Sequence, residues 1–166
     1  MILQNIDWAD LDAACLETAQ KIKDAAPSAS FEYSSSAFLP DCIIAIAKGG
    51  LVPARIIARH LKIERIYCVG AKAYSGMDSL EELKVYQGLP MLNSTNMLIV
   101  DDISDRGNTL TDIKSLCVGV CSMGANIMTA APYYKTGTMH IPDFSATEFP
   151  RDNWIVFPWE DPPEDI

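Results

Sequence analysis

The chain has little of what marks membrane, secreted or nucleic-acid-binding proteins. Its 166 residues include no apolar run long enough to cross a bilayer. The N-terminus lacks the basic segment followed by an apolar segment that forms a secretory signal. Acidic residues outnumber basic residues by 22 to 13, and the basic residues form no stripe, so we expect no binding to nucleic acid. These absences favour a cytoplasmic protein without a membrane span.

Cysteine and histidine are also too sparse to suggest a metal centre. The five cysteines are scattered and form no Cys-x-x-Cys pair, so we expect reduced thiols. Cys117 and Cys121 are one helical turn apart, but no nearby histidine or cysteine completes a zinc site. For the two histidines, His60 and His140, the sequence predicts no catalytic role.

What the chain does contain is a hydrophobic fraction of 49%, which is enough for one domain with a core. Apolar, β-rich runs predict strands at 42–47, 65–70, 97–101 and the start of 126–134. Helical apolar spacing predicts helices at 8–25, 51–61 and 110–124, the first of them capped by Asp7. This alternation predicts an α/β fold, in which helices flank a mostly parallel sheet. Residues 71–95 have weak periodicity and predict an excursion with a short hairpin.

The turn DRGNT (105–109) joins the predicted strand 97–101 to a helix. The first turn of a helix offers unpaired N–H groups and the positive end of the helix dipole. Gly107 lets the backbone approach an anion, and Thr109 adds a hydroxyl donor, so the turn can cradle a phosphate. The alternative is an ordinary helix start, capped by Asp105 or Asn108.

Two further acids, Asp101 and Asp102, stand between that strand and the turn. Carboxylates accept hydrogen bonds from ribose hydroxyls and can hold a hydrated Mg²⁺. Ligands of parallel sheets bind at the carboxyl ends of strands, where this segment lies. Acids and turn together therefore suit a sugar phosphate.

The whole stretch LIVDDISDRGNTL (98–110) resembles the signature of the type I phosphoribosyltransferases, which use phosphoribosyl pyrophosphate (PRPP). Arg106 stands where that family usually has threonine. The resemblance implies that Asp101 and Asp102 hold the ribose and Mg²⁺, and that Asp105 is a general base or proton holder for the purine. It also implies that the 5′-phosphate is bound by Arg106, Gly107, Asn108 and Thr109.

Two other segments extend the resemblance in the same order along the chain. AIAKGGLVPARIIARHL (45–61) is similar to the pyrophosphate loop, which implies that PRPP is bound by Lys48, Gly49 and Gly50. AKAYSGMDSLEELKVYQ (71–87) resembles the flexible catalytic loop, with Tyr74 at its start and Ala73 where the subgroup usually has serine. The alternative for this segment is an ordinary mobile loop.

The C-terminal part resembles the xanthine-guanine branch of the family. In APYYKTG (131–137), Lys135 takes the place of a lysine that meets the purine O6. In DNWIVFPWE (152–160), Trp154 would cover the base and Ile155 would lie beside it. An ammonium donor favours a 6-oxo group over the amino group of adenine. The alternatives are a solvated loop lysine and a tryptophan that only covers the sheet, the latter strongest for Trp159.

The resemblance thus implies one phosphoribosyltransferase domain over 1–166, with a core at about 40–135, a flexible loop at about 73–95 and a hood at about 136–166. It would transfer the 5-phosphoribosyl group of PRPP to guanine, xanthine or hypoxanthine in purine salvage, with Mg²⁺, as a homodimer or homotetramer.

Two other functions are compatible with parts of the pattern. A regulator that binds PRPP or a nucleotide without turnover would keep the fold, and Arg106 and Ala73 favour it. A receiver-like domain would phosphorylate one acid of the pair, but it leaves the glycine turn and the C-terminal aromatics without a role. No Walker motif occurs, which disfavours an NTPase.

Overall fold

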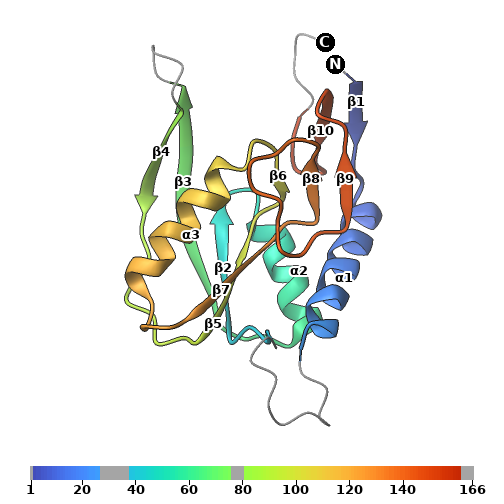
Figure 1. The fold of residues 1–166 in the computed structure, drawn as a ribbon. Coiled ribbons are helices and arrows are strands. Elements are labelled where there is room, and N and C mark those ends of the chain that lie inside the picture. Colours follow the sequence, from blue (N-terminus) through green and yellow to red (C-terminus); the bar gives the residue numbers. More distant parts are fainter. Residues whose placement is uncertain (1, 27–37, 76–80, 162–166) are drawn as a thin grey trace.

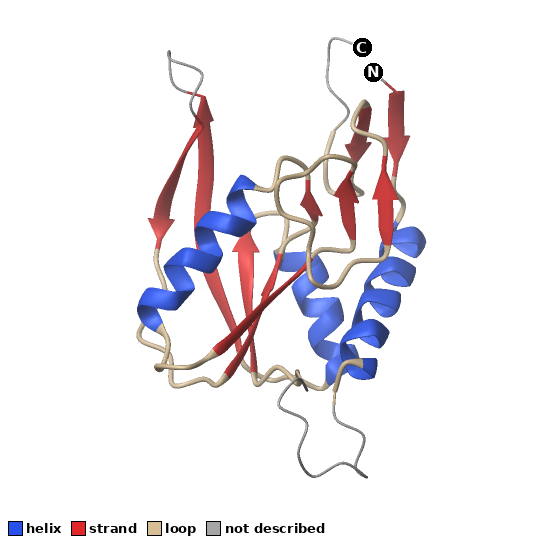
Figure 2. Ribbon diagram, viewed as in Figure 1, coloured by secondary structure: helices blue, strands red, loops and turns tan. Residues whose placement is uncertain are grey.

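The computed structural model describes residues 2–26, 38–75 and 81–161. Over these residues the chain forms a central sheet with helices on both faces (Figure 1, Figure 2). Two smaller groups of strands lie beside the upper part of this sheet in the view that Figures 1 and 2 share, and they include the first and last described strands.

Within the described residues, the central sheet has five strands in the order β4 (Glu81–Gln87), β3 (Ile66–Ser75), β2 (Cys42–Ala47), β5 (Asn96–Val100) and β7 (Asn126–Ala130). All neighbours are parallel except β3 and β4, which form an antiparallel pair at one edge. The predicted fold class, a mostly parallel sheet flanked by helices, is confirmed.

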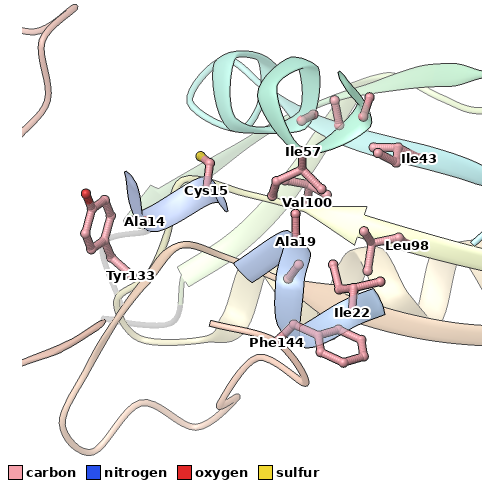
Figure 3. Close-up of a cluster of buried hydrophobic side chains, with 14 of the residues drawn as sticks. Ala14, Cys15, Ala19, Ile22, Ile43, Ile57, Leu98, Val100, Tyr133 and Phe144 are labelled. Atoms are coloured by element: carbon pink, nitrogen blue, oxygen red, sulfur yellow. The ribbon is translucent and has the colours of Figure 1, made fainter. Parts of the chain in front are cut away.

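The described helices divide between the two faces of this sheet. One face is covered by α1 (Trp8–Asp24) and α2 (Leu51–Leu61), and the other by α3 (Asn108–Val120). The central strand β2 is apolar at every position because each face of the sheet needs its own set of side chains. In β2, Ile43 packs with the α1 and α2 side chains, whereas Ile44 packs with those of α3. Figure 3 shows Ile57 of α2 near Val100 of β5.

The excursion after the second predicted strand is the β3–β4 hairpin. The strand predicted at 65–70 continues to Ser75 because β4 pairs with its outer half, from Gly70 to Ser75. The predicted hairpin is therefore present. The proposed flexible loop also includes residues 76–80, which lie outside the described residues.

The smaller strands form two further groups. One has the order β6 (Ile103–Ser104), β8 (Tyr133–Lys135) and β9 (Thr147–Phe149), and the other pairs β1 (Ile2–Asn5) with β10 (Asn153–Val156). The strand expected from residue 126 is thus split into β7 and β8, and the tail folds into strands that periodicity did not predict. These strands hold the C-terminal residues above the carboxyl ends of the central sheet (Figure 1).

The sequence predicted no membrane span and reduced cysteine thiols. Among the described residues, no helix combines the length and the apolar character that crossing a membrane requires. All five cysteines are free, and three of them are buried, which agrees with the expected reduced thiols.

Candidate active site

The Lys-Gly-Gly turn (48–50) and the acid pair, Asp101 and Asp102, meet at the carboxyl ends of the adjacent strands β2 and β5. Gly49 lies so close to the second acid that a Cβ atom there would overlap the carboxylate of Asp102. A Cβ atom on Gly50 would likewise overlap the carbonyl oxygen of Val100. Both glycines are therefore needed for this contact, and the Lys-Gly-Gly turn and the acid pair form one site. The peptide bond between Ala47 and Lys48 is cis, and the Lys48 side chain is exposed.

The acid pair is half-buried and held by the backbone. The backbone N–H of Asp102 donates to Asp101 Oδ1 at 3.0 Å, and that of Ile103 donates to Asp102 Oδ1 at 2.7 Å. Burial and the neighbouring charge of Asp102 raise the pKa of Asp101 well above its ordinary value. Burial, with a smaller contribution from the charge of Glu160, raises the pKa of Asp102 to about 6. The chain therefore keeps two carboxylates where ionisation is costly.

A divalent cation beside this pair would remove that cost. Carboxylate oxygens are hard donors, and Mg²⁺ is commonly held by one or two carboxylates together with substrate phosphates. In the described part of the chain no group of three or more metal-binding side chains occurs. The donor set of Asp101 and Asp102 therefore fits an Mg²⁺ that arrives with a phosphorylated ligand, rather than a metal enclosed by protein.

The turn at residues 105–109, called the phosphate turn below, leads into α3 without a side-chain cap. Its N-cap residue is Gly107, with a φ of 90°, and no cap side chain bonds to the first N–H groups. The alternative start, with Asp105 or Asn108 as the cap, is wrong, and the helix begins two residues earlier than the predicted 110. The amides at the positive end of α3 are thus left for another acceptor.

A cavity of about 350 Å³ opens in front of this turn. Its lining comes from the first acid of the pair, strand β6, the phosphate turn, the start of α3 and the C-terminal tail: Asp101, Ile103, Ser104, Asp105, Arg106, Gly107, Asn108, Thr109, Leu110 and Trp154. Six residues predicted to bind the ribose, the phosphate or the base line one hollow. Asp105, which was predicted to be a general base or proton holder for the purine, also lines the cavity.

Lys135 reaches this site from the end of β8. Its side chain is only 9% exposed, and its Nζ atom lies 3.1 Å from Asp105 Oδ2. A buried ammonium with a carboxylate partner is not a solvated loop lysine, so that alternative is wrong. The structure thus places a donor beside an acceptor, and the acceptor, Asp105, lines the cavity, whereas Lys135 itself is not among the lining residues.

The tail places its two candidate side chains on opposite sides of β10. Trp154 is 46% exposed and lines the cavity, whereas Ile155 is 8% exposed and packs in the core. Because side chains alternate along a strand, neighbouring residues cannot both face the cavity. The Ile155 side chain is therefore not brought to the site. Trp159 stacks on Phe157 with ring centroids 4.8 Å apart, as expected for a hydrophobic cover.

The predicted catalytic loop is described only in part. Tyr74 belongs to β3, where its Cα pairs with Glu82 of β4, and its side chain lies outside the described residues. Sequence reasoning missed two contributors to the site. One is β1, which holds β10 in place, and the other is the segment 138–140, which packs on the phosphate turn. Neither carries a local motif.

Comparison with known proteins agrees with this geometry. The family described as the phosphoribosyl transferase domain matches residues 13–164. The xanthine-guanine phosphoribosyltransferase of Idiomarina loihiensis is 29% identical over 93% of this chain and 85% of its own length. That of Desulfotalea psychrophila is 33% identical over 71% of this chain and 69% of its own length. The crystal structure of the purine phosphoribosyltransferase from Pyrococcus horikoshii is 28% identical, with a TM-score of 0.79 over 98% of this chain and 97% of that one.

The family match covers nearly the whole chain, and the alignments with these relatives cover most of each relative's own length. Together with the paired turns at the strand ends, they show that the chain belongs to the phosphoribosyltransferase family and is a transferase enzyme of the type I fold.

Proposed function

We propose that this phosphoribosyltransferase transfers the 5-phosphoribosyl group of PRPP to a 6-oxopurine, which is guanine, xanthine or hypoxanthine. The observation that carries the proposal is the Lys135–Asp105 pair, whose Nζ and Oδ2 atoms are 3.1 Å apart and whose carboxylate lines the cavity. A 6-oxopurine has an acceptor, O6, next to the N–H of its imidazole ring. A donor and an acceptor side by side match these two atoms, whereas adenine presents an amino group to the lysine.

The reaction breaks the bond between the anomeric carbon and pyrophosphate and forms a bond from that carbon to a purine nitrogen. Asp105 takes the proton from the ring N–H next to O6 while the other imidazole nitrogen forms the bond to the anomeric carbon, and Lys135 holds O6. Trp154 stacks on the base and excludes water from one side of it. Lys48 and the amides of the Gly49 turn face the leaving pyrophosphate.

The sugar end of PRPP is held at the strand end. The amides of the first turn of α3, with Arg106 and Thr109, bind the 5′-phosphate, and Asp101 and Asp102 bind the ribose diol. Mg²⁺ held by the two acids would neutralise charge on the pyrophosphate. For Tyr74 a place in the closing loop stays a prediction, as does a homodimer or homotetramer in a cytoplasmic setting.

A spectrophotometric assay with PRPP and Mg²⁺ tests the proposal against five bases: guanine, xanthine, hypoxanthine, adenine and orotate. We expect turnover of the 6-oxopurines alone, and loss of it when Mg²⁺ is chelated. Asp105→Asn should lower kcat by about 100-fold or more, because the proton acceptor is lost. Asp112→Asn, on an exposed position of α3, is the matched control and should leave the rate unchanged. Turnover of adenine or orotate at a comparable rate would contradict the base assignment.

A regulator that binds PRPP without turnover is the second candidate, and Arg106 in the phosphate turn is the feature that favours it. Calorimetric titration with PRPP separates the two candidates, since binding without turnover of any of the five bases identifies the regulator.

A further inference from the structure

We propose that His140 is a positioning residue for the phosphate turn, a role that rests on the proposed function of that turn. His140 lies outside the cavity, and nothing in the sequence around it predicts a role. Its backbone nevertheless contacts the phosphate turn, and its two ring nitrogens contact the first turn of α3 and strand β7.

The backbone around His140 forms the floor of the turn. Gly107 packs so tightly on this segment that a Cβ atom there would overlap the backbone nitrogen of His140. On one side, the N–H of Met139 donates to the carbonyl of Arg106 at 2.9 Å. On the other, the hydroxyl of Ser104 donates to the carbonyl of His140 at 2.6 Å. The position of residue 140 therefore fixes the path of the chain through the turn.

The imidazole ring joins the helix to the sheet behind the turn. Its Nδ1 atom lies 3.1 Å from the hydroxyl of Thr111, in the first turn of α3. Its Nε2 atom lies 3.0 Å from the hydroxyl of Thr129, in β7. One half-buried side chain thus ties the end of α3 that offers its amides to a strand of the central sheet.

The hydrogen bonds of the two threonines decide the protonation of the ring. The Thr111 hydroxyl donates to the carbonyl of Gly107 at 3.1 Å, so it accepts from the ring, and Nδ1 carries a proton. The Thr129 hydroxyl lies 2.9 Å from Asp143 Oδ2 and can donate either to that carboxylate or to Nε2. If it donates to Nε2, the ring is neutral with its proton on Nδ1.

The charges around the ring favour this neutral form. Burial, and next the charge of Lys114 on α3, lower the pKa of His140, whereas Asp143 opposes them. Asp143 does not depend on the threonine hydroxyl, because it also accepts the backbone N–H of Thr129 at 2.7 Å. Lys114 lies 3.7 Å from the same carboxylate oxygen. A neutral ring can then hold Thr111 and Thr129 without placing another cation beside Lys114.

Such a link predicts a selective effect on the two substrates. The ring of His140 contacts α3 and β7, whereas the groups proposed to bind the purine, Lys135 and Trp154, belong to β8 and β10. Loss of the ring should therefore displace the amides that bind the 5′-phosphate and leave the purine end in place. A residue with a merely structural role would instead lower the stability and affect both substrates alike.

The test compares His140→Ala with His140→Asn and His140→Gln. The amide nitrogen of asparagine can occupy the position of Nδ1 and still donate to Thr111, whereas the longer glutamine places its amide near Nε2. We expect His140→Ala to raise KM for PRPP about tenfold, since one or two hydrogen bonds are lost, with kcat and the purine KM changed less than about twofold. His140→Asn should restore most of the PRPP affinity, and His140→Gln should not.

The control is His60→Ala, in the last turn of α2, which should match the wild type. Calorimetric titration with PRPP, with circular dichroism to check folding, provides a readout that does not need turnover. An unchanged PRPP affinity in His140→Ala overturns the inference, and so does an equal rise of both KM values. If His140→Ala does not fold, His140→Asn and His140→Gln decide, and equal PRPP affinities for them would overturn it. A wild type that binds PRPP without turning over any base would refute the proposed function alone.

Discussion

Helices α1 and α3 begin in opposite ways. At the start of α1, Asp7 accepts the N–H of Asp10 at 2.8 Å, and Asp10 accepts the N–H of Asp7 at 3.2 Å, which closes a reciprocal capping box. At the start of α3, Gly107 supplies no side chain, and no acid stands in the first turn. The first helix satisfies its own amides, and the third leaves them available.

The difference follows the position of each helix relative to the sheet. Helices α2 and α3 begin at the carboxyl ends of β2 and β5, and both have a glycine at the N-cap without a side-chain bond. Helix α1, the helix with the carboxylate cap, does not follow a strand of the central sheet. An open helix start costs stability, so its presence at two adjacent strand ends indicates that a ligand completes it.

The largest effect is expected from a substitution at the uncapped start of α3. Gly107→Ala forces a side chain into a residue with a φ of 90° and against the backbone of His140. We expect KM for PRPP to rise about 100-fold or more, because both the strain and the overlap distort the turn.

Gly124→Ala is the matched control for this change. Gly124 has a φ of 81°, but its Cβ would meet no atom within 4 Å. Both variants should lose about 1 kcal/mol of stability to backbone strain, but only Gly107→Ala should lose PRPP affinity in steady-state kinetics. Equal PRPP affinity in the two variants would show that the turn does not hold the phosphate.

The next largest effect is expected from a substitution in the acid pair at the end of β5, in contrast to the acids that cap α1. Asp102→Asn should lower kcat/KM by about 100-fold, since a ligand of the ribose and Mg²⁺ is weakened. The same change should stabilise the metal-free protein at pH 7.5 by roughly 1 kcal/mol, or about 2–4 °C in Tm. The reason is that burial and repulsion make the ionised pair costly.

The sign of this effect depends on pH. Because the pKa of Asp102 is raised from 3.8 to about 6, the folded protein binds the proton more tightly, and stability is lost as the pH rises through this window. Thermal melts in EDTA at pH 4.5 and 7.5 should therefore show a larger stabilising effect of Asp102→Asn at the higher pH. The difference between variant and wild type cancels the contribution of His140. A lower Tm of the variant at pH 7.5 would contradict the prediction.

The smallest effect is expected at the closed start. Asp7→Ala removes the capping box of α1 and should cost about 1 kcal/mol, or roughly 2–4 °C in Tm. Both KM values and kcat should stay within about twofold of the wild type, because α1 contributes no residue to the cavity. Kinetic damage comparable to that of Gly107→Ala would remove the distinction between the two helix starts.

The sequence was most informative where the local pattern and the fold agree. The strand at 42–47 and the helix at 51–61 have the predicted bounds, because a fully apolar run and a glycine turn delimit them. The start of α3 was missed by two residues, since a glycine cap leaves no side-chain signal. The residues predicted to bind PRPP follow the buried strands β2 and β5, and this position at the strand ends is what the sequence pattern indicated.

The remaining parts depend on pairing between distant segments. Strands β1 and β10 are short, and each gains its hydrogen bonds from the other, so neither shows a pattern of its own. Had the tail been recognised as a strand, alternation would have separated Trp154 from Ile155. The proposed role of His140 depends on contacts among its own segment, the start of α3 and β7, and such contacts cannot be read from one sequence.

The pairing of β1 with β10 also determines when the site can be completed. Ile2 pairs with Asn153 and Leu3 with Trp154, so the side of the site proposed to cover the base joins the first described strand to the last. On the ribosome, the strand ends that form the phosphate turn are synthesised before this side of the site. Contacts between such distant residues form slowly. A nascent chain can therefore carry the turn proposed to bind a phosphate before it has the strand proposed to cover a purine, and β1 has no partner until β10 has been synthesised.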